Sequence, residues 1–315
     1  MWREYSDLDA ERAAIRAENG LPDDSPSPFV DPDRDAGPEP IHATPFVWRD
    51  PAILPLRPWV YGRHLLRRQV SVTVAAGGTG KSSLTIAEAL AMASGRSLLG
   101  DWTEQGLMVW LYNLEDPRDE MDRRIIATMH HHGVTPQEVA GRLFVNTGRE
   151  RALTTAIQTR DGVQIIKPEL DALAAEIESR GIDVLVVDPF VSSHRVRESD
   201  NGDIDLVAKE WARLADWCNC AIELVHHTRK TNGADATTED GRGAYALLAA
   251  ARSGRVLNKM NAQERAEAGL TNDPLTYFSV TRDKANLAPA GAREWRRVVS
   301  VSLGNGDTVG VVEAW

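Results

Sequence analysis

The stretch from Val70 to Leu84, VSVTVAAGGTGKSSL, limits what this chain can fold into more than any other. Alternating valines predict a β-strand, three glycines within four residues predict a tight turn, and an amphipathic helix is expected to begin at Lys81. Glycines let consecutive backbone N–H groups point inward, and the helix N-terminus adds the positive end of its dipole. A strand, a glycine-rich loop and a helix in this order predict a phosphate-binding P-loop.

The loop predicts ATP and Mg²⁺ as cofactors. The Lys81 ammonium would bridge the β- and γ-phosphates, and the Ser82 hydroxyl would ligate Mg²⁺. Ala75 stands where the pattern G-x-x-x-x-G-K-[ST] has its first glycine. A glycine-rich turn that arose by chance is the alternative, and the flanking strand and helix argue against it. The expected nucleotide-binding residues of the loop are Ala76, Gly77, Gly78, Thr79, Gly80, Lys81, Ser82 and Ser83.

Charge and proline are concentrated at the N-terminal side. The net charge is −10, and residues 1–40 hold eleven acidic residues against four arginines, so the remainder is nearly neutral. This excludes a generally basic nucleic-acid binder but leaves room for a local basic lining. A short helix is expected at Asp7–Asn19, and the dense prolines of Leu21–Pro58 predict an extended linker. We therefore expect an acidic, proline-rich arm at 1–58, which either docks on a neighbouring subunit or partner or is a solvated tail, and a nucleotide-binding domain at 59–315.

The remaining bulk features indicate a cytoplasmic protein. No apolar run approaches membrane-spanning length, and the charged N-terminus is unlike a secretory signal. The two cysteines, Cys218 and Cys220, are expected to be reduced thiols.

The body alternates strands and helices, which predicts a parallel sheet with helices on both faces. After Val225 the strands follow one another closely, and Gly304–Gly306 is expected to form a hairpin turn, so we predict an antiparallel extension on the sheet edge. Strands are expected at Val70–Val74, Leu107–Leu111, Leu143–Asn146, Asp183–Val187, Ala221–Val225, Arg255–Asn258, Tyr277–Thr281, Val298–Ser302 and Thr308–Val312, and helices at Lys81–Ala93, Asp116–His131, Pro168–Arg180 and Ile204–Cys218.

Acidic residues follow two of the predicted strands. Glu115 comes just past the strand that ends near Tyr112, where it would polarise the water that attacks the γ-phosphate. Its alternative role is to stabilise the N-terminus of the next helix. Asp188 ends the apolar strand IDVLVVD, and there it would hold Mg²⁺ beside Ser82. A strand ending in an acid between the P-loop and Asp188 favours a hydrolase over a nucleotide kinase.

Polar residues at further strand ends complete the predicted site. Strand alternation lets one of His226 and His227 face the nucleotide, and counting from the strand selects His227 over a surface-turn role. Two loops carry arginines and lysines that could contact a DNA backbone, although both also carry acids and are equally consistent with ordinary solvated loops. These candidate DNA-binding residues are Arg195 and Arg197 in Ser192–Asp200, and Arg229, Lys230 and Arg242 around Lys230–Gly241.

The ordered motifs AGGTGKSS, NLEDP, VVDPF, HHTRK, GRGAYALLAAAR, KANLAP and EWRR resemble those of RepA-type hexameric replicative helicases, within the RecA-like P-loop ATPases. The resemblance covers about Trp59 to Glu313 and implies a RecA-like domain, a ring of six and ATP sites between subunits. It implies that Arg124 contacts bound nucleotide and that Arg252 is an arginine finger for the neighbouring subunit. Arg255 is a competing choice for the finger, and Lys284 would lie near the same interface.

Two functions follow as expectations. The first is an ATP-hydrolysing, ring-forming motor on single-stranded DNA, a DNA helicase in plasmid, phage or mobile-element replication. The second is a nucleotide-switched regulatory or assembly ATPase that does not unwind DNA. In either case Lys81, Glu115, Asp188, His227 and Arg252 are the expected catalytic residues.

Overall fold

The computed structural model describes residues 41–104, 106–227, 244–287 and 291–315. The chain divides into two units, Met1–Pro58 and Trp59–Trp315. In the first unit the described residues 41–58 are exposed and lack regular structure except for the 3₁₀-helix η1 (Pro51–Ile53). The helix predicted at Asp7–Asn19 lies outside the described residues.

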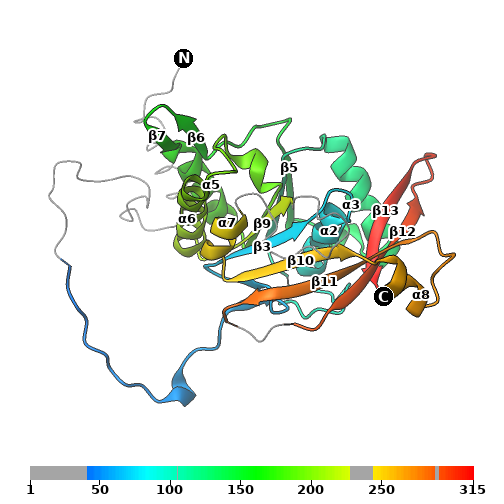
Figure 1. The fold of residues 1–315 in the computed structure, drawn as a ribbon, viewed down its shortest axis with the longest axis horizontal. Helices are drawn as coiled ribbons and strands as arrows, with labels where there is room; N and C mark the ends of the chain where they lie inside the picture. The colour runs from blue at the N-terminus through cyan, green and yellow to red at the C-terminus, as the bar shows by residue number, and fades with distance from the viewer. Residues whose placement is uncertain (1–40, 105, 228–243, 288–290) are drawn as a thin grey trace. The chain divides into compact units, whose positions relative to one another are not determined.

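A nine-stranded sheet forms the second unit, in the order β13-β12-β11-β10-β3-β9-β8-β4-β5 (Figure 1). Neighbouring strands are parallel from β10 to β5 and antiparallel from β10 to β13. The α/β architecture predicted from the sequence is therefore confirmed. Its strands are β3 (Val70–Ala75), β4 (Val109–Asn113), β5 (Leu143–Thr147), β8 (Val184–Asp188), β9 (Ala221–His227), β10 (Ser253–Lys259), β11 (Thr276–Ala285), β12 (Glu294–Ser302) and β13 (Thr308–Ala314).

One feature of the predicted extension is wrong. β10 lies beside the P-loop strand β3 and runs parallel to it, with Ser253 opposite Ser71 and Leu257 opposite Ala75. The antiparallel part therefore begins at β11, one strand later than expected. A parallel neighbour needs a crossover connection, and the chain between β9 and β10, which contains α7 (Ala244–Ala250), is long enough to provide one.

The P-loop helix α2 (Lys81–Ser94) packs on one face of the sheet. Its residues Ile86 and Leu90 join a buried cluster with Val184, Val186 and Val225 from the sheet. Helices α2 and α3 contact each other, and α6 and α7 contact each other and the strand β3. Within the described residues no helix combines the length and apolar character that crossing a membrane needs. The remaining helices are α3 (Arg118–His132), α4 (Pro136–Val139), α5 (Lys167–Arg180), α6 (Asn201–Trp217), α8 (Ala262–Glu267) and η2 (Phe190–Ser193), and two short pairs are β1 (Trp59–Tyr61) with β2 (Leu65–Leu66) and β6 (Ala156–Thr159) with β7 (Gly162–Ile165).

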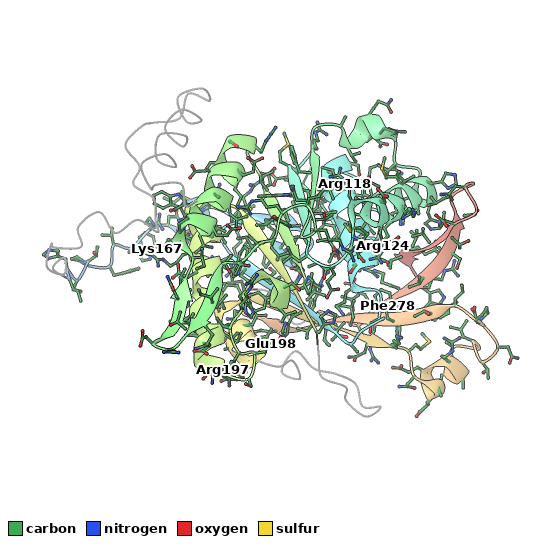
Figure 2. All side chains as sticks on the ribbon, turned by 90° about the horizontal axis from the view of Figure 1, so that it is seen from above. Arg118, Arg124, Lys167, Arg197, Glu198 and Phe278 are labelled. Atoms are coloured by element: carbon green, nitrogen blue, oxygen red, sulfur yellow. The ribbon has the colours of Figure 1, made fainter. Side chains whose placement is uncertain are left out.

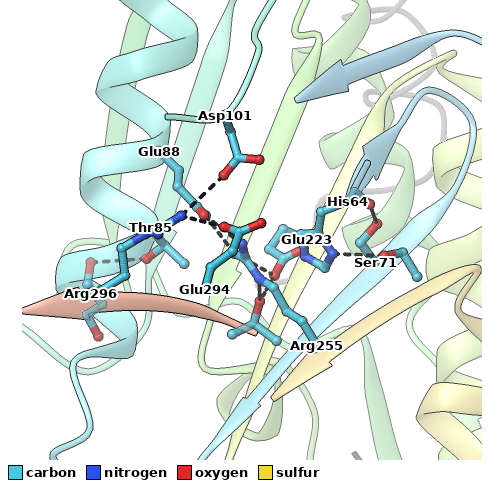
Figure 3. Close-up of polar contacts among 12 residues, drawn as sticks. His64, Ser71, Thr85, Glu88, Asp101, Glu223, Arg255, Glu294 and Arg296 are labelled. Carbon is cyan, nitrogen blue, oxygen red and sulfur yellow. Dashed lines mark hydrogen bonds and ion pairs between the residues drawn. The ribbon is translucent and has the colours of Figure 1, made fainter. Parts of the chain in front are cut away.

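A charged network is buried between α2 and the sheet (Figure 3). The Arg255 guanidinium donates from Nη1 and Nη2 to the two Glu88 carboxylate oxygens, each at 2.6 Å, and from Nε to Thr73 Oγ1 at 2.7 Å. Glu223 completes the network, because its Oε2 lies 2.8 Å from His64 Nε2 and its Oε1 lies 3.7 Å from Arg255 Nη2. Burial acts to lower the pKa of Arg255, but Glu88 and Glu223 outweigh it and raise that pKa above its usual value.

The expectation that Arg255 competes for a subunit interface is therefore wrong. Its side chain is only 4% exposed, and all three nitrogens face partners inside the domain. Because the Arg255 guanidinium is buried and bonded to these partners, it cannot contact a neighbouring molecule. Arg255 instead ties the P-loop helix to strands β3 and β9.

Replacing Arg255 with methionine is expected to destabilise the domain by about 3–5 kcal/mol, because Glu88 and Glu223 would remain buried without their cation. Denaturant-induced unfolding measures the change. Lys209→Met is the matched control, since Lys209 makes an exposed i,i+4 pair with Asp205 that is worth less than about 1 kcal/mol. Equal stability of the two variants would show that the buried network contributes nothing.

Candidate active site

The carboxyl ends of β4, β8 and β9 and the loop that follows β3 open into one cavity of about 610 Å³. Ligands of open α/β sheets bind at this edge, where loops rather than strands meet. The lining residues are Gly78, Gly80, Lys81, Ser82, Ser83, Glu115, Glu120, Arg123, Arg124, Asp188, His227, Asp307, Thr308, Val309 and Gly310.

The loop between β3 and α2 has the conformation of a phosphate cradle. Gly78 and Gly80 adopt φ angles of +68° and +109°, which side-chain-bearing residues rarely take. A Cβ at Gly80 would lie 3.1 Å from the ring of Phe278, so glycine is also needed for packing. The Lys81 ammonium donates to the carbonyls of Ala75 and Ala76, each at 3.1 Å. The cation is thus held over the loop where phosphate oxygens would enter.

Ser82 and Asp188 converge from the helix and the sheet. Ser82 Oγ donates to Asp188 Oδ2 at 2.6 Å, and Asp188 is 7% exposed. Burial raises the pKa of Asp188, while the Ser82 hydrogen bond and the Lys81 charge act against the rise. A hydroxyl and a carboxylate beside a phosphate cradle are oxygen ligands of the kind Mg²⁺ prefers. The residues present therefore fit a Mg²⁺ ion.

Glu115 and His227 lie beside Lys81 in the cavity. His227 Nδ1 lies 3.1 Å from Lys81 Nζ, and His227 Nε2 lies 3.9 Å from Glu115 Oε1. Burial lowers the pKa of His227, and the Lys81 charge lowers it further against the opposing effect of Glu115. Burial likewise lowers the pKa of Lys81, against Asp188 and Glu115. A neutral imidazole with its hydrogen on Nε2 can accept from Lys81 and face Glu115.

Of the two adjacent histidines, the structure places only His227 in the cavity. His226 is 2% exposed, and its ring lies 6.0 Å from that of Phe190. Strand alternation produces this difference, because successive side chains of β9 point to opposite faces.

Arg124 reaches the cavity from α3. Its Nε donates to Glu120 Oε1 and its Nη1 donates to Asp116 Oδ2, both at 2.8 Å. These two carboxylates hold the guanidinium at the rim, where it can meet a nucleotide.

Arg252 and Lys284 lie outside this cavity. The Arg252 N–H donates to the Val70 carbonyl at 3.0 Å, which places it at the start of β3, at the opposite end of that strand from the P-loop. The Arg252 side chain is exposed, and Lys284 Nζ donates to the Leu248 carbonyl. Burial lowers the pKa of Lys284, and the nearby Arg252 charge adds to this effect. The half-buried Lys284 thus lies close to the exposed Arg252.

The predicted DNA-binding residues are only partly described. Arg195 and Arg197 are exposed, but their segment is tied to β6, because the Arg195 N–H donates to the Ala156 carbonyl at 2.8 Å. Figure 2 shows Arg197 beside Glu198 and well apart from Arg118 and Arg124. Arg229, Lys230 and Arg242 lie outside the described residues.

Several residues in or near the cavity were not anticipated. Lys259 Nζ lies 4.0 Å from where a Cβ on Gly78 would be, because β10 runs parallel beside β3 and ends next to the loop. No local motif marks Lys259, since its position depends on strand pairing. The sequence also did not predict that Glu120, Arg123 and residues 307–310 line the cavity. A helix was expected directly after Glu115, so the side chains of the first turns of that helix could have been expected near the cavity.

The comparison with known protein families agrees with this geometry. A family model described as an AAA domain matches residues 37–233, more than half of the chain. The match includes the P-loop, Glu115, Asp188 and His227, whereas Arg252 and the strands β10–β13 follow it. On this match and on the phosphate cradle with its acidic partners, the chain belongs to the AAA domain family and carries a P-loop ATPase domain.

Proposed function

We propose that this protein is an ATP-hydrolysing motor that assembles into a ring, as a hexamer, and moves along single-stranded DNA. A DNA helicase in plasmid, phage or mobile-element replication is the function that fits the ordered motifs best. The position of Arg252 is the observation that carries the proposal. Phosphoryl transfer commonly uses an arginine from a second molecule, and the exposed position of Arg252, away from the P-loop of its own subunit, supports such a role.

The distance along β3 supports this role. Arg252 lies beside the first residue of β3, and the P-loop begins after its last. Six residues at about 3.3 Å each span about 17–20 Å, which is farther than one arginine side chain extends. Arg252 therefore cannot reach the phosphates of its own subunit. Within the described part of the chain neither Arg252 nor Lys284 has a carboxylate partner, so an anion from a second copy would satisfy both.

The cavity residues divide the proposed reaction among them. Glu115, 57% exposed, orients the attacking water and accepts its proton. Lys81 binds the transferring phosphoryl group, and His227 links Lys81 to Glu115, so a change at the phosphate can reach β9. Ser82 and Asp188 would hold Mg²⁺, which neutralises developing charge on the phosphates. The Arg252 guanidinium of a second copy supplies the remaining positive charge.

Mixing two inactive variants tests the shared site. When assembled alone, Lys81→Ala subunits are expected to hydrolyse ATP about 10²–10³-fold or more slowly than wild type, and Arg252→Ala subunits about 10³-fold or more slowly. Mixed assemblies contain interfaces with an intact Lys81 on one side and an intact Arg252 on the other, so part of the activity should return. Phosphate release measured over a series of mixing ratios gives the result.

The mixing experiment has a built-in control. Lys81→Ala mixed with the double variant Lys81→Ala/Arg252→Ala has no complete interface and should stay inactive. If the first mixture also stays inactive at every ratio, Arg252 does not act across an interface.

A separate measurement tests the motor. Native mass spectrometry with ATP and single-stranded DNA should show a hexamer with bound DNA, and DNA should accelerate ATP hydrolysis. Arg195→Ala/Arg197→Ala should weaken that acceleration if this segment contacts the phosphate backbone. A monomer whose hydrolysis is indifferent to DNA would contradict the motor function.

A second candidate is a nucleotide-switched assembly ATPase that does not unwind DNA. It is favoured by the exposed apolar side chains in 41–58, which suit a protein partner. Robust hydrolysis without strand displacement on a forked DNA, together with loss of a co-purifying partner after deletion of 41–58, would support it. Unwinding of the fork by the protein alone would exclude it. The exposed residues are Ile41, Phe46, Val47, Trp48, Ile53, Leu54 and Leu56.

A further inference from the structure

The far wall of the cavity comes from the C-terminal hairpin, which we define as residues 294–314 and which lies beyond the span of the family match. Thr308, Val309 and Gly310 line the cavity from β13. Ser83 follows the magnesium-binding Ser82, and its Oγ donates to the Gly310 carbonyl at 3.2 Å. β13 of the hairpin therefore borders the phosphate cradle.

The C-terminal hairpin is attached to α3 along its length (Figure 1). Away from the cavity, His131 Nε2 lies 2.6 Å from Glu313 Oε2, and His132 Nε2 lies 2.9 Å from the Val312 carbonyl. Ala127 of α3 packs with buried valines of both strands of the hairpin. These contacts anchor the base of the hairpin.

One ion pair holds its tip at the cavity. Arg123 Nε lies 3.1 Å from Asp307 Oδ2, and both residues line the cavity. The turn presents Asp307 for this contact, because Asn305 Oδ1 accepts from the Asp307 N–H at 2.9 Å and Gly304 and Gly306 adopt φ angles of +74° and +98°. Arg123 also lies 3.7 Å from Glu120 Oε2 on its own helix. We call the Arg123–Asp307 pair the clasp.

We propose that the clasp positions β13 as the nucleoside-binding wall of the site, and that this wall recognises the base through backbone groups and the Val309 side chain. The inference rests on the proposed ATPase function. β13 is the edge strand of the sheet, so one side of its backbone has no strand partner, although the Gly310 and Val312 carbonyls already accept from Ser83 and His132. No Phe, Tyr or Trp is among the described residues that line the cavity. Arg123 and Asp307 act as positioning residues.

The clasp is important for the local geometry rather than for the stability of the domain. The Arg123 and Asp307 side chains are 40% and 52% exposed, and exposed ion pairs contribute less than about 1 kcal/mol. Removing either charge should leave the domain folded while releasing the tip of the hairpin. Because the variants change the position of the hairpin tip without unfolding the domain, measurements of nucleotide binding can test the proposal.

The test compares a ligand that has a nucleoside with one that lacks it. Calorimetry on the full chain with Mg²⁺ measures affinity for ATP and for inorganic tripolyphosphate. Arg123→Gln and Asp307→Asn are expected to weaken ATP binding by up to about fivefold, or about 1 kcal/mol, and to change tripolyphosphate binding by less than about twofold. Arg118→Gln is the matched control, because Arg118 makes an exposed pair with Asp122 on the same helix but does not line the cavity.

A charge swap provides a second arm. Arg123→Asp/Asp307→Arg rebuilds the pair in reverse and should restore most of the ATP affinity that Arg123→Asp alone loses. A parallel loss of ATP and tripolyphosphate binding, or unchanged ATP binding in both single variants, would overturn the nucleoside wall. If the wild-type protein binds neither ligand, the proposed ATPase function fails instead.

Discussion

Replacing Lys81 with alanine is expected to lower ATP turnover by about 10²–10³-fold or more and to weaken ATP binding. Lys81 is 6% exposed and its ammonium lies 3.1 Å from each of two P-loop carbonyls, so its charge is poorly screened by water. Lys259 lies near Gly78 but does not line the cavity, so Lys81 is the one lysine among the described residues that do. Phosphate-release kinetics and calorimetry with ATP measure the two effects.

Two comparisons make the Lys81→Ala result specific. Lys209→Ala removes an exposed lysine on α6 and should leave both turnover and ATP affinity within about twofold of wild type. Thermal unfolding without nucleotide should show that Lys81→Ala is folded, since its loss removes a desolvated charge from the loop. Wild-type turnover by folded Lys81→Ala would show that the phosphates bind elsewhere.

Replacing Glu115 with glutamine is expected to lower turnover by about 10²–10⁴-fold while ATP affinity changes little. The amide keeps the size of the side chain but cannot accept a proton from the attacking water. Glu115 lines the cavity, and its Oε1 lies 3.9 Å from His227 Nε2. Single-turnover hydrolysis separates this chemical step from ATP binding.

Glu120→Gln is the contrasting variant for this prediction. Glu120 lines the same cavity, but its carboxylate accepts from Arg124 at 2.8 Å and so is occupied by an ion pair. Its loss should therefore change KM rather than kcat. Turnover by Glu115→Gln equal to that of wild type would show that a different group activates the water.

Much of the fold could be predicted because it is encoded locally. Valine-rich strands and amphipathic helices follow from side-chain periodicity, and the predicted boundaries of most elements lie within three residues of those observed. The direction of β10 could not be predicted, because strand direction depends on which neighbour the strand pairs with. In the sheet, β10 and β9 lie on either side of β3, and β10 runs parallel to β3.

The candidate site shows the same division. Lys81, Ser82, Glu115 and Asp188 could be predicted because each follows a strand end within a motif, and parallel strands bring such ends to one edge of the sheet. Lys259 carries no such signal, because only the pairing of β10 with β3 brings it near Gly78.

The sequence by itself determined that a phosphate cradle and two acids at strand ends, Glu115 and Asp188, occur in this order, since each depends on residues close together along the chain. Only the tertiary structure decided which arginines are available for function. Arg252 immediately precedes β10, and Arg255 lies three positions later, inside that strand. Arg255 is nevertheless enclosed by Glu88 and Thr73, while Arg252 is exposed. The burial of a side chain on a strand depends on which other parts of the chain pack against that strand. In this domain those parts are far apart in the sequence and extend from α2 to the C-terminal hairpin.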